Sequence, residues 1–249
     1  MFLHWDLSPY NMCKRFQNGT FPHLSKKAHQ TRFPVRLLKY WWVACKIQEE
    51  LENKQNLIVG DIGCGSCQMK MMADFLPSTT WIGTDLHLNE KELKEAEYDS
   101  YFESDLTKNL PIEDDFFDIV INSHVLEHLP NPKYSLGELY RIVKPGGILL
   151  LGIPVSPGVV VPFQKKRYAK ELRAGKRKIG DHIQAFSAHD AIALLKQAGF
   201  SSIEGVSGTY FMRKQGFVLE NYAWWIRLNQ LFGAIFPSFG QELCIVARK

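Results

Sequence analysis

Short apolar runs alternate with amphipathic stretches along most of this chain. An apolar run that ends in a turn-forming or acidic residue predicts a strand, because a strand covered on both faces is apolar throughout. Apolar residues at helical spacing predict the helices between these runs. The expected strands are 57–62, 80–85, 100–104, 116–122, 147–153, 202–206 and 243–247, and the expected helices are 35–51, 69–76, 88–98, 132–143 and 187–197.

This alternation predicts an α/β fold with a doubly wound, mostly parallel sheet of seven strands and helical inserts. We expect one domain over residues 1–249. Ligands of such sheets bind outside the carboxyl ends of the strands. The expected parts are an N-terminal helical cap (1–56), a cofactor-binding core (57–153), a basic lid insert (154–186) and a C-terminal half (187–249) with an apolar helical insert at 212–239.

Charge is distributed unevenly. The formal net charge is +4, but residues 165–178 hold eight basic residues and one acidic residue. The rest of the chain is therefore slightly acidic, and the basic run is a local patch. Such a patch is typical of a solvated helix face, or it attracts an anionic substrate or an acidic membrane surface.

Several features favour a cytoplasmic protein. The first six residues show no basic region followed by an apolar one, so we expect no secretory leader. No run of about eighteen uncharged apolar residues occurs, so a membrane-spanning helix is not expected. The five cysteines are unevenly spaced and odd in number, which does not indicate a disulfide framework.

The first predicted strand leads into a turn with the sequence Asp61-Ile-Gly63-Cys64-Gly65. Two glycines spaced by one allow backbone N–H groups to approach a ligand closely. A P-loop is excluded because Lys70 lacks its glycine and its Ser/Thr neighbour. The dinucleotide fingerprint is broken because Gln68 stands at its third glycine. A turn without a ligand stays open, but the pattern resembles the first motif of class I S-adenosylmethionine-dependent methyltransferases.

Three acids lie at the carboxyl ends of successive predicted strands. They are Asp61, Asp85 and Asp105. Asp85 lies 22 residues beyond Gly63, the usual distance to an acid that binds ribose hydroxyls. Each acid alone is also typical of a solvated turn, but three in register favour a ligand site.

A longer resemblance covers about residues 57–153. Phe117-Asp118, then Val125 to Leu129, then Lys144-Pro-Gly-Gly147 are similar in order and sequence to small-molecule class I methyltransferases, including the ubiquinone-biosynthesis group. The family often has a third glycine where Cys67 stands. The resemblance implies S-adenosyl-L-methionine as cofactor and S-adenosyl-L-homocysteine as product. It further implies that Asp61, Gly63 and Gly65 hold the methionine part, Asp85 the ribose, Asp105 and Leu106 the adenine, and that the segment at Ser123 lines the sulfonium. Cys64 is a further candidate for cofactor binding, and Leu86 and Leu106 are expected as apolar walls for the adenine ring.

Two metal or redox interpretations are disfavoured. Cys64 and Cys67 form a C-x-x-C, but zinc would need two further ligands at similar spacing. His124 to His128 matches H-x-x-E-H, a motif that must lie on one helix in an inverted zinc protease, whereas here it falls at a strand-to-helix junction. We therefore expect no metal.

Methyl transfer to a hydroxyl needs a proton acceptor, and His suits that role near neutral pH. The candidates are His124, His128 and His182, of which His124 follows a strand end directly. Each is also typical of a packing or capping histidine.

The expected function is methyl transfer to a small molecule such as a sugar, a glycolipid or another anionic, lipid-linked intermediate. Motifs of nucleic-acid base methyltransferases are missing, because Asn122-Ser-His-Val follows the fourth strand. The alternatives are an RNA methyltransferase that uses the basic insert and a non-catalytic binding subunit.

The apolar insert is typical of a helix packed on the sheet, but it also suits an apolar substrate wall or peripheral membrane contact.

Overall fold

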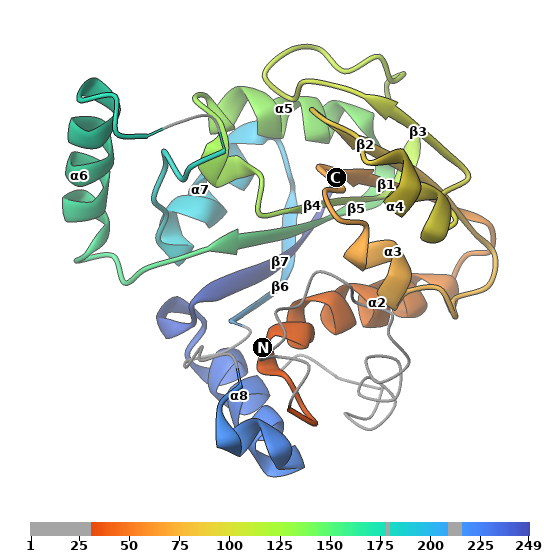
Figure 1. The fold of residues 1–249 in the computed structure, drawn as a ribbon. Helices are drawn as coiled ribbons and strands as arrows, with labels where there is room; N and C mark the ends of the chain where they lie inside the picture. The colour runs from red at the N-terminus through yellow and green to blue at the C-terminus, as the bar shows by residue number, and fades with distance from the viewer. Residues whose placement is uncertain (1–30, 178–179, 209–215) are drawn as a thin grey trace.

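The computed structural model describes residues 31–177, 180–208 and 216–249. Most of the expected N-terminal cap therefore lies outside the described residues, as does the start of the apolar insert. Figure 1 shows a central sheet with helices on both faces.

The described part of the chain contains one sheet of seven strands, in the order β3-β2-β1-β4-β5-β7-β6. The five strands from β3 to β5 are parallel, and β7 runs antiparallel to both of its neighbours. The expected doubly wound, mostly parallel fold is thus confirmed. The strands are β1 Leu57–Ile62, β2 Thr79–Asp85, β3 Ser100–Glu103, β4 Phe117–Ser123, β5 Val143–Pro154, β6 Ser202–Gly208 and β7 Glu242–Arg248.

The helices follow the predicted order, with shorter α3 and α4. α4 begins after the Asn89 cap, and Glu97 then takes a left-handed φ of 57° that no helix can continue. α3 ends at Met72, where the C-cap Ala73 already departs from helical geometry with a φ of −96° and a ψ of 10°. The helical elements are η2 Val35–Leu37, α2 Leu38–Leu51, α3 Gln68–Met72, α4 Glu90–Glu95, η3 Leu126–His128, α5 Pro132–Ile142, α6 Val161–Arg173, α7 Ala188–Ala198, η4 Val218–Asn221, α8 Ala223–Ile235 and η5 Pro237–Phe239.

Each face of the sheet has its own apolar core. On one face, α2, α3 and α8 contribute residues such as Trp41, Met72 and Trp225 to a single cluster. On the other face, α5 and α7 contribute Leu139 and Leu195. Burial of these layers holds the sheet rigid, so the strand ends keep fixed positions relative to one another.

The two inserts are helical. α6 lies between β5 and α7, and it carries most of the basic run. α8 lies between β6 and β7 and buries Trp225 and Ile226 while Trp224, Leu231 and Phe236 stay about half exposed. One side of α8 therefore packs on the protein, as expected, and the other is apolar and open. Among the described residues, no helix is both long enough and apolar enough to cross a membrane.

Candidate active site

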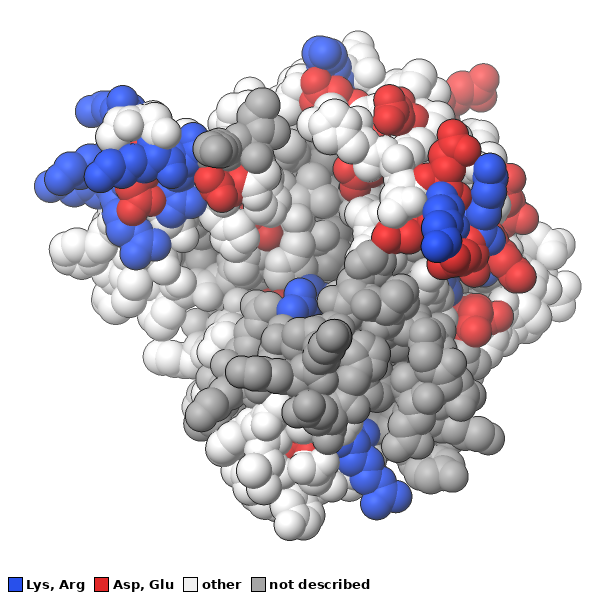
Figure 2. Space-filling model, in the orientation of Figure 1, with Lys and Arg blue, Asp and Glu red and all other residues white. Residues whose placement is uncertain are grey.

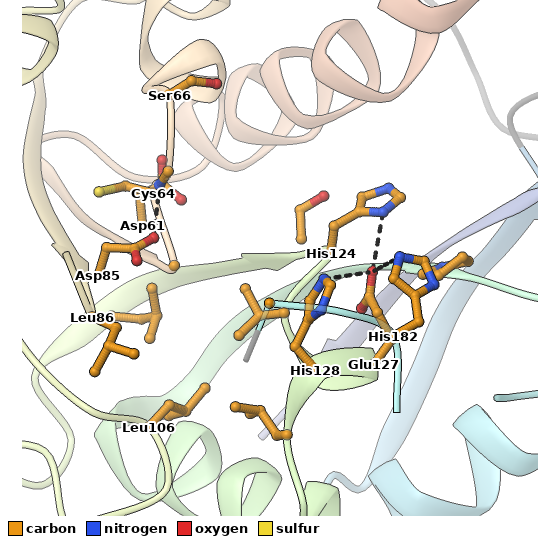
Figure 3. A pocket seen from close by; sticks show the side chains of 18 of the residues that line it. Asp61, Cys64, Ser66, Asp85, Leu86, Leu106, His124, Glu127, His128 and His182 are labelled. Atoms are coloured by element: carbon orange, nitrogen blue, oxygen red, sulfur yellow. Dashed lines mark hydrogen bonds and ion pairs between the residues drawn. The ribbon is translucent and has the colours of Figure 1, made fainter. Parts of the chain in front are cut away.

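A cavity of about 1540 Å³ opens at the carboxyl ends of the parallel strands. It extends from the turn after β1 to the segment after β4 and the loop before α7 (Figure 3). The cavity brings together all the site residues expected from the sequence: Asp61, Gly63, Cys64, Gly65, Asp85, Leu86, Asp105, Leu106, Ser123, His124, His128 and His182. Their individual roles stay predictions.

The turn after β1 needs both of its glycines. Gly63 has a φ of +87°, and a Cβ there would lie 2.3 Å from Val125 Cγ2. Gly65 has a φ of +48°, and a Cβ there would meet no atom within 4 Å. The first glycine thus lets the turn pack against the segment after β4, and the second leaves an open cradle beside the backbone. This geometry suits the methionine part of the expected cofactor.

The cradle is tied to the end of β2. The Gly65 amide donates to Asp85 Oδ2 at 2.9 Å, and the Gly63 amide donates to the Thr84 carbonyl at 2.7 Å. Asp85 is half-buried and lines the cavity. A carboxylate in this position can accept hydrogen bonds from a diol through its remaining lone pairs.

Asp61 is a buried carboxyl group. Its side chain is 2% exposed, and the Tyr98 hydroxyl donates to Asp61 Oδ2 at 2.6 Å. Burial raises the pKa of Asp61 to about 7, the charge of Asp85 adds to the increase, and the Tyr98 hydrogen bond opposes it. A cationic group beside Asp61, such as the α-ammonium of a methionine moiety, would favour its ionised form.

Cys67 stands in a position that favours glycine. It begins α3 with a φ of 59° and is fully buried. Glycine would adopt this left-handed conformation without the steric cost that a Cβ brings. Hydrogen bonding with Cys67 and burial raise the pKa of Cys64 well above its ordinary range, so Cys64 stays a thiol and is poorly suited to redox or metal chemistry.

The residues expected to contact adenine lie on the opposite side of the cavity from the histidines. Figure 3 shows Leu86 and Leu106 there, below Asp85. Leu106 is buried and Leu86 is 45% exposed, so the two present an apolar wall with room beside it. Asp105 accepts hydrogen bonds from the Thr107 hydroxyl at 2.6 Å and the Thr107 amide at 3.0 Å, which lower its pKa. An adenine amine would have to share this carboxylate with Thr107.

His124 is held between two buried carboxylates. Its Nδ1 lies 3.3 Å from Glu127 Oε1, and its Nε2 lies 3.2 Å from Glu242 Oε1. Burial alone lowers the pKa of His124, but the two carboxylates outweigh it and raise the pKa. His124 also has a φ of 60°, a left-handed conformation that is uncommon outside glycine and often found at functional sites.

His128 and His182 approach the same carboxylate. Their Nε2 atoms lie 3.8 and 4.0 Å from Glu127 Oε1, and their rings meet edge to face with centroids 4.9 Å apart. Figure 3 shows the three histidines arranged around Glu127. Burial lowers the pKa of His182, which favours its neutral form.

Sequence reasoning missed four residues that organise the site. Tyr98, Glu127 and Glu242 are the partners described above, and Lys39 of α2 lies 3.5 Å from Glu242 Oε1. Glu127 lies within the His124–His128 motif, and Glu242 directly precedes the apolar run 243–247. An acidic residue next to positions expected to be buried could therefore have indicated both as site residues. Lys39 gave no signal, because a lysine on an amphipathic helix is ordinarily exposed.

The chain is similar in sequence to known methyltransferases. Residues 60–151 match the family described as "Methyltransferase domain". A sterol 4-C-methyltransferase of Caenorhabditis elegans is 32% identical over 111 residues, which are 41% of this chain and 33% of that protein. An uncharacterized methyltransferase of Mycobacterium bovis is 30% identical over 125 residues, 47% of each chain. The chain thus matches less than half the length of these curated relatives.

Solved structures agree at the level of the fold. A protein from Galdieria sulphuraria superimposes with a TM-score of 0.65 at 13% identity, over 95% of this chain and 98% of that one. An S-adenosylmethionine-dependent methyltransferase from Mesorhizobium loti gives a TM-score of 0.55 at 20% identity, over 86% and 100%. The fold is thus the one shared by these solved methyltransferases, and residues 60–151 carry the match to the methyltransferase domain family.

Proposed function

We propose that this chain transfers a methyl group from S-adenosylmethionine to a small-molecule acceptor. The observation that carries the proposal is the single cavity that joins the glycine turn to the histidine cluster. It provides a cradle for a cofactor at one end and a candidate proton acceptor at the other.

The residues present fit the expected cofactor. The open backbone at Gly65 and the carboxylates of Asp61 and Asp85 would hold the methionine and ribose parts, and the leucine wall would cover the adenine. The cofactor supplies an electrophilic methyl group on a sulfonium. Because the reaction is an in-line displacement, the main task of the chain is to align the acceptor and exclude water.

His124 is our candidate general base. It is 25% exposed at the side chain, lines the cavity and is oriented from both sides by Glu127 and Glu242. Its raised pKa means that it must lose a proton before it can accept one from the acceptor. Methyl transfer should therefore fall as the pH drops below that pKa.

The inserts favour an anionic or lipid-linked acceptor. Figure 2 shows a dense group of basic side chains over α6. Arg177, which follows α6 in the same basic run, lines the cavity, and its guanidinium donates to the His182 carbonyl. The apolar outer side of α8 suits contact with lipid. The nematode relative is named as acting on a sterol, which is consistent with a lipid acceptor.

We also infer a reducing, cytoplasmic setting for this enzyme. Among the described residues, Cys64, Cys67 and Cys244 are buried and free of disulfides. Free buried thiols are ordinary in a reducing compartment.

The test is methyl transfer from radiolabelled cofactor into fractionated metabolites and lipids of a cell lysate. The wild-type chain should label an organic-soluble or anionic small molecule, and His124→Ala should lower the rate by about 100-fold, as loss of a general base does. His189→Ala, an exposed histidine on α7, is the matched control. Labelling of RNA would favour the RNA alternative. Cofactor binding without any labelled product would favour a non-catalytic binding subunit.

A further inference from the structure

The histidine cluster contains a set of metal-type ligands that the proposed base does not use. Glu127, His128 and His182 each offer one ligand atom, and these atoms lie within 4.8 Å of one another. The Glu127 side chain is fully buried, and neither of its oxygens has a hydrogen-bond partner of good geometry. A buried carboxylate without hydrogen bonds is costly, so it requires a positive partner.

The backbone holds this set in place. The amides of Ile183 and Gln184 donate to the Glu127 carbonyl at 2.8 and 3.0 Å. This contact ties the segment that carries His182 to η3, although the two are 55 residues apart in sequence. Arg177 holds the same segment from the side of α6. The three side chains therefore meet on fixed backbone, as an ion-binding site requires.

The charge balance also favours a cation. Glu127 and Glu242 are both buried, and Lys39 approaches Glu242 at 3.5 Å. Among the described residues, the groups that approach Glu127 closely are imidazoles, which are neutral unless protonated. No lysine or arginine of the described residues forms an ion pair with Glu127, so its charge is balanced either by a protonated imidazole or by a bound cation.

The donor set selects the type of ion. Two imidazole nitrogens and one carboxylate oxygen suit zinc and similar transition metals, whereas magnesium and calcium prefer oxygen ligands. Around such an ion, ligand atoms lie roughly 3.3 Å apart. The observed separations of 3.8 and 4.0 Å from Glu127 Oε1 would need to close by about 0.5 and 0.7 Å, and the ligand atoms all lie within 4.8 Å of one another before an ion draws them together.

We propose that Glu127, His128 and His182 bind a divalent transition-metal ion whose open position faces the cofactor cavity and takes an oxygen of the acceptor. This inference deepens the proposed function and rests on it for the acceptor. A metal-bound hydroxyl is more acidic than a free one. The hydroxyl proton would pass to His124, the C–O bond would form as the C–S bond of the sulfonium breaks, and S-adenosylhomocysteine would leave as a neutral thioether.

The proposal revises the expectation of no metal. The H-x-x-E-H interpretation used His124 and His128 as ligands on one helix, but His124 lies before η3 and faces Glu242. The structure instead supplies His182 from a distant loop, and it makes the glutamate a ligand. Because His182 is distant from Glu127 and His128 in the sequence, the three residues form no short motif that could have predicted a metal site.

The experiment is a titration of the chelator-treated full chain with Co²⁺ alone, followed by visible absorption and calorimetry. We expect one equivalent to bind, with absorption bands that Zn²⁺ abolishes by competition. His182→Ala and Glu127→Gln should each weaken binding by at least 100-fold, whereas His189→Ala should leave it unchanged. Because the His182 side chain is 44% exposed, its removal should not unfold the protein, and circular dichroism checks this.

Two outcomes would overturn the inference: the wild-type chain takes up no stoichiometric Co²⁺, or His182→Ala and Glu127→Gln bind it as well as wild type does. Either result would leave the cluster as an imidazolium–carboxylate group. The metal-free chain should still bind S-adenosylhomocysteine in a separate titration. Failure of that second titration would count against the proposed function and not against the metal site, so the two failures are distinguishable.

Discussion

At the residue scale, the site is built from side chains in unfavourable environments. Asp61 is buried beside a second acid, His124 and Cys67 have left-handed backbones, and Glu127 is buried without a hydrogen bond. Such environments lower the stability of the folded state, and in proteins they are concentrated at functional sites, where ligand binding offsets the loss. The sequence indicated Asp61 and His124, because acids and histidines at strand ends are conspicuous. It could not indicate their burial, which depends on Tyr98 and Glu242 from elsewhere in the chain.

Asp61→Asn should stabilise the cofactor-free protein at high pH. Folding raises the pKa of Asp61 from 3.8 to about 7, so the folded state binds the extra proton between these values. Stability of the wild type should therefore fall as the pH rises from about 4 to about 7, and the Asn variant should lack this loss. Above pH 7 the variant should gain about 2–4 kcal/mol in free energy of unfolding.

Denaturant unfolding at several pH values measures this gain, and calorimetry should show much weaker cofactor binding to the same variant. If the Asn variant is less stable than wild type at pH 8, burial does not disfavour the ionised form of Asp61 as described here.

Cys67→Gly should be no less stable than Cys67→Ala, the reverse of the usual order at the start of a helix. Alanine keeps the Cβ and therefore keeps the left-handed cost of about 1–2 kcal/mol, while it also loses the buried sulfur. Glycine loses more contact area but releases the backbone. Thermal unfolding of the two variants decides the point. A glycine variant clearly below the alanine variant would show that Cys67 is retained for its packing.

At the element scale, sequence patterns predicted the strands, the longer helices and the positions of the two inserts, but not the surfaces against which the inserts pack. The capping box of Ser187 and Asp190 begins α7 and the left-handed Gly199 ends it, close to the expected range 187–197, because these signals are local. The surface against which an insert packs depends on the tertiary structure. α8 buries one side against the core and exposes the other, and because both sides are apolar, its sequence alone could not show which side is buried.

The exposed side of α8 should bind anionic membranes. Leu231 on this side and Phe236 directly after the helix are about half exposed. Moving exposed apolar side chains from water into a lipid interface is favourable. Leu231→Glu combined with Phe236→Glu should abolish sedimentation with vesicles of phosphatidylcholine and phosphatidylglycerol. Tyr134→Glu, on α5, is the control. Wild-type protein that stays in the supernatant at low salt would exclude this contact.

At the scale of the whole molecule, the sheet order explains why one cavity collects residues from distant parts of the sequence. The neighbouring strands β2, β1 and β4 end at the same edge, and β7 and the loop before α7 meet them there. The cofactor residues lie on consecutive parallel strands, so their proximity could be predicted from the order of elements. His182 and Glu242 come from the loop before α7 and from antiparallel β7, and only the completed packing brings them to Glu127 and His124.

We propose that this cavity binds the methyltransferase cofactor through the carboxylate of Asp85 at the end of β2. Calorimetric titration with S-adenosylhomocysteine tests it most directly. We expect one molecule to bind per chain, and Asp85→Ala to weaken the affinity by at least about tenfold, since a charge-assisted hydrogen bond contributes about 1.5–3 kcal/mol. Glu113→Gln, an exposed acid outside the cavity, should bind as wild type does. Absence of binding to the wild type, or equal binding to Asp85→Ala, would contradict the account.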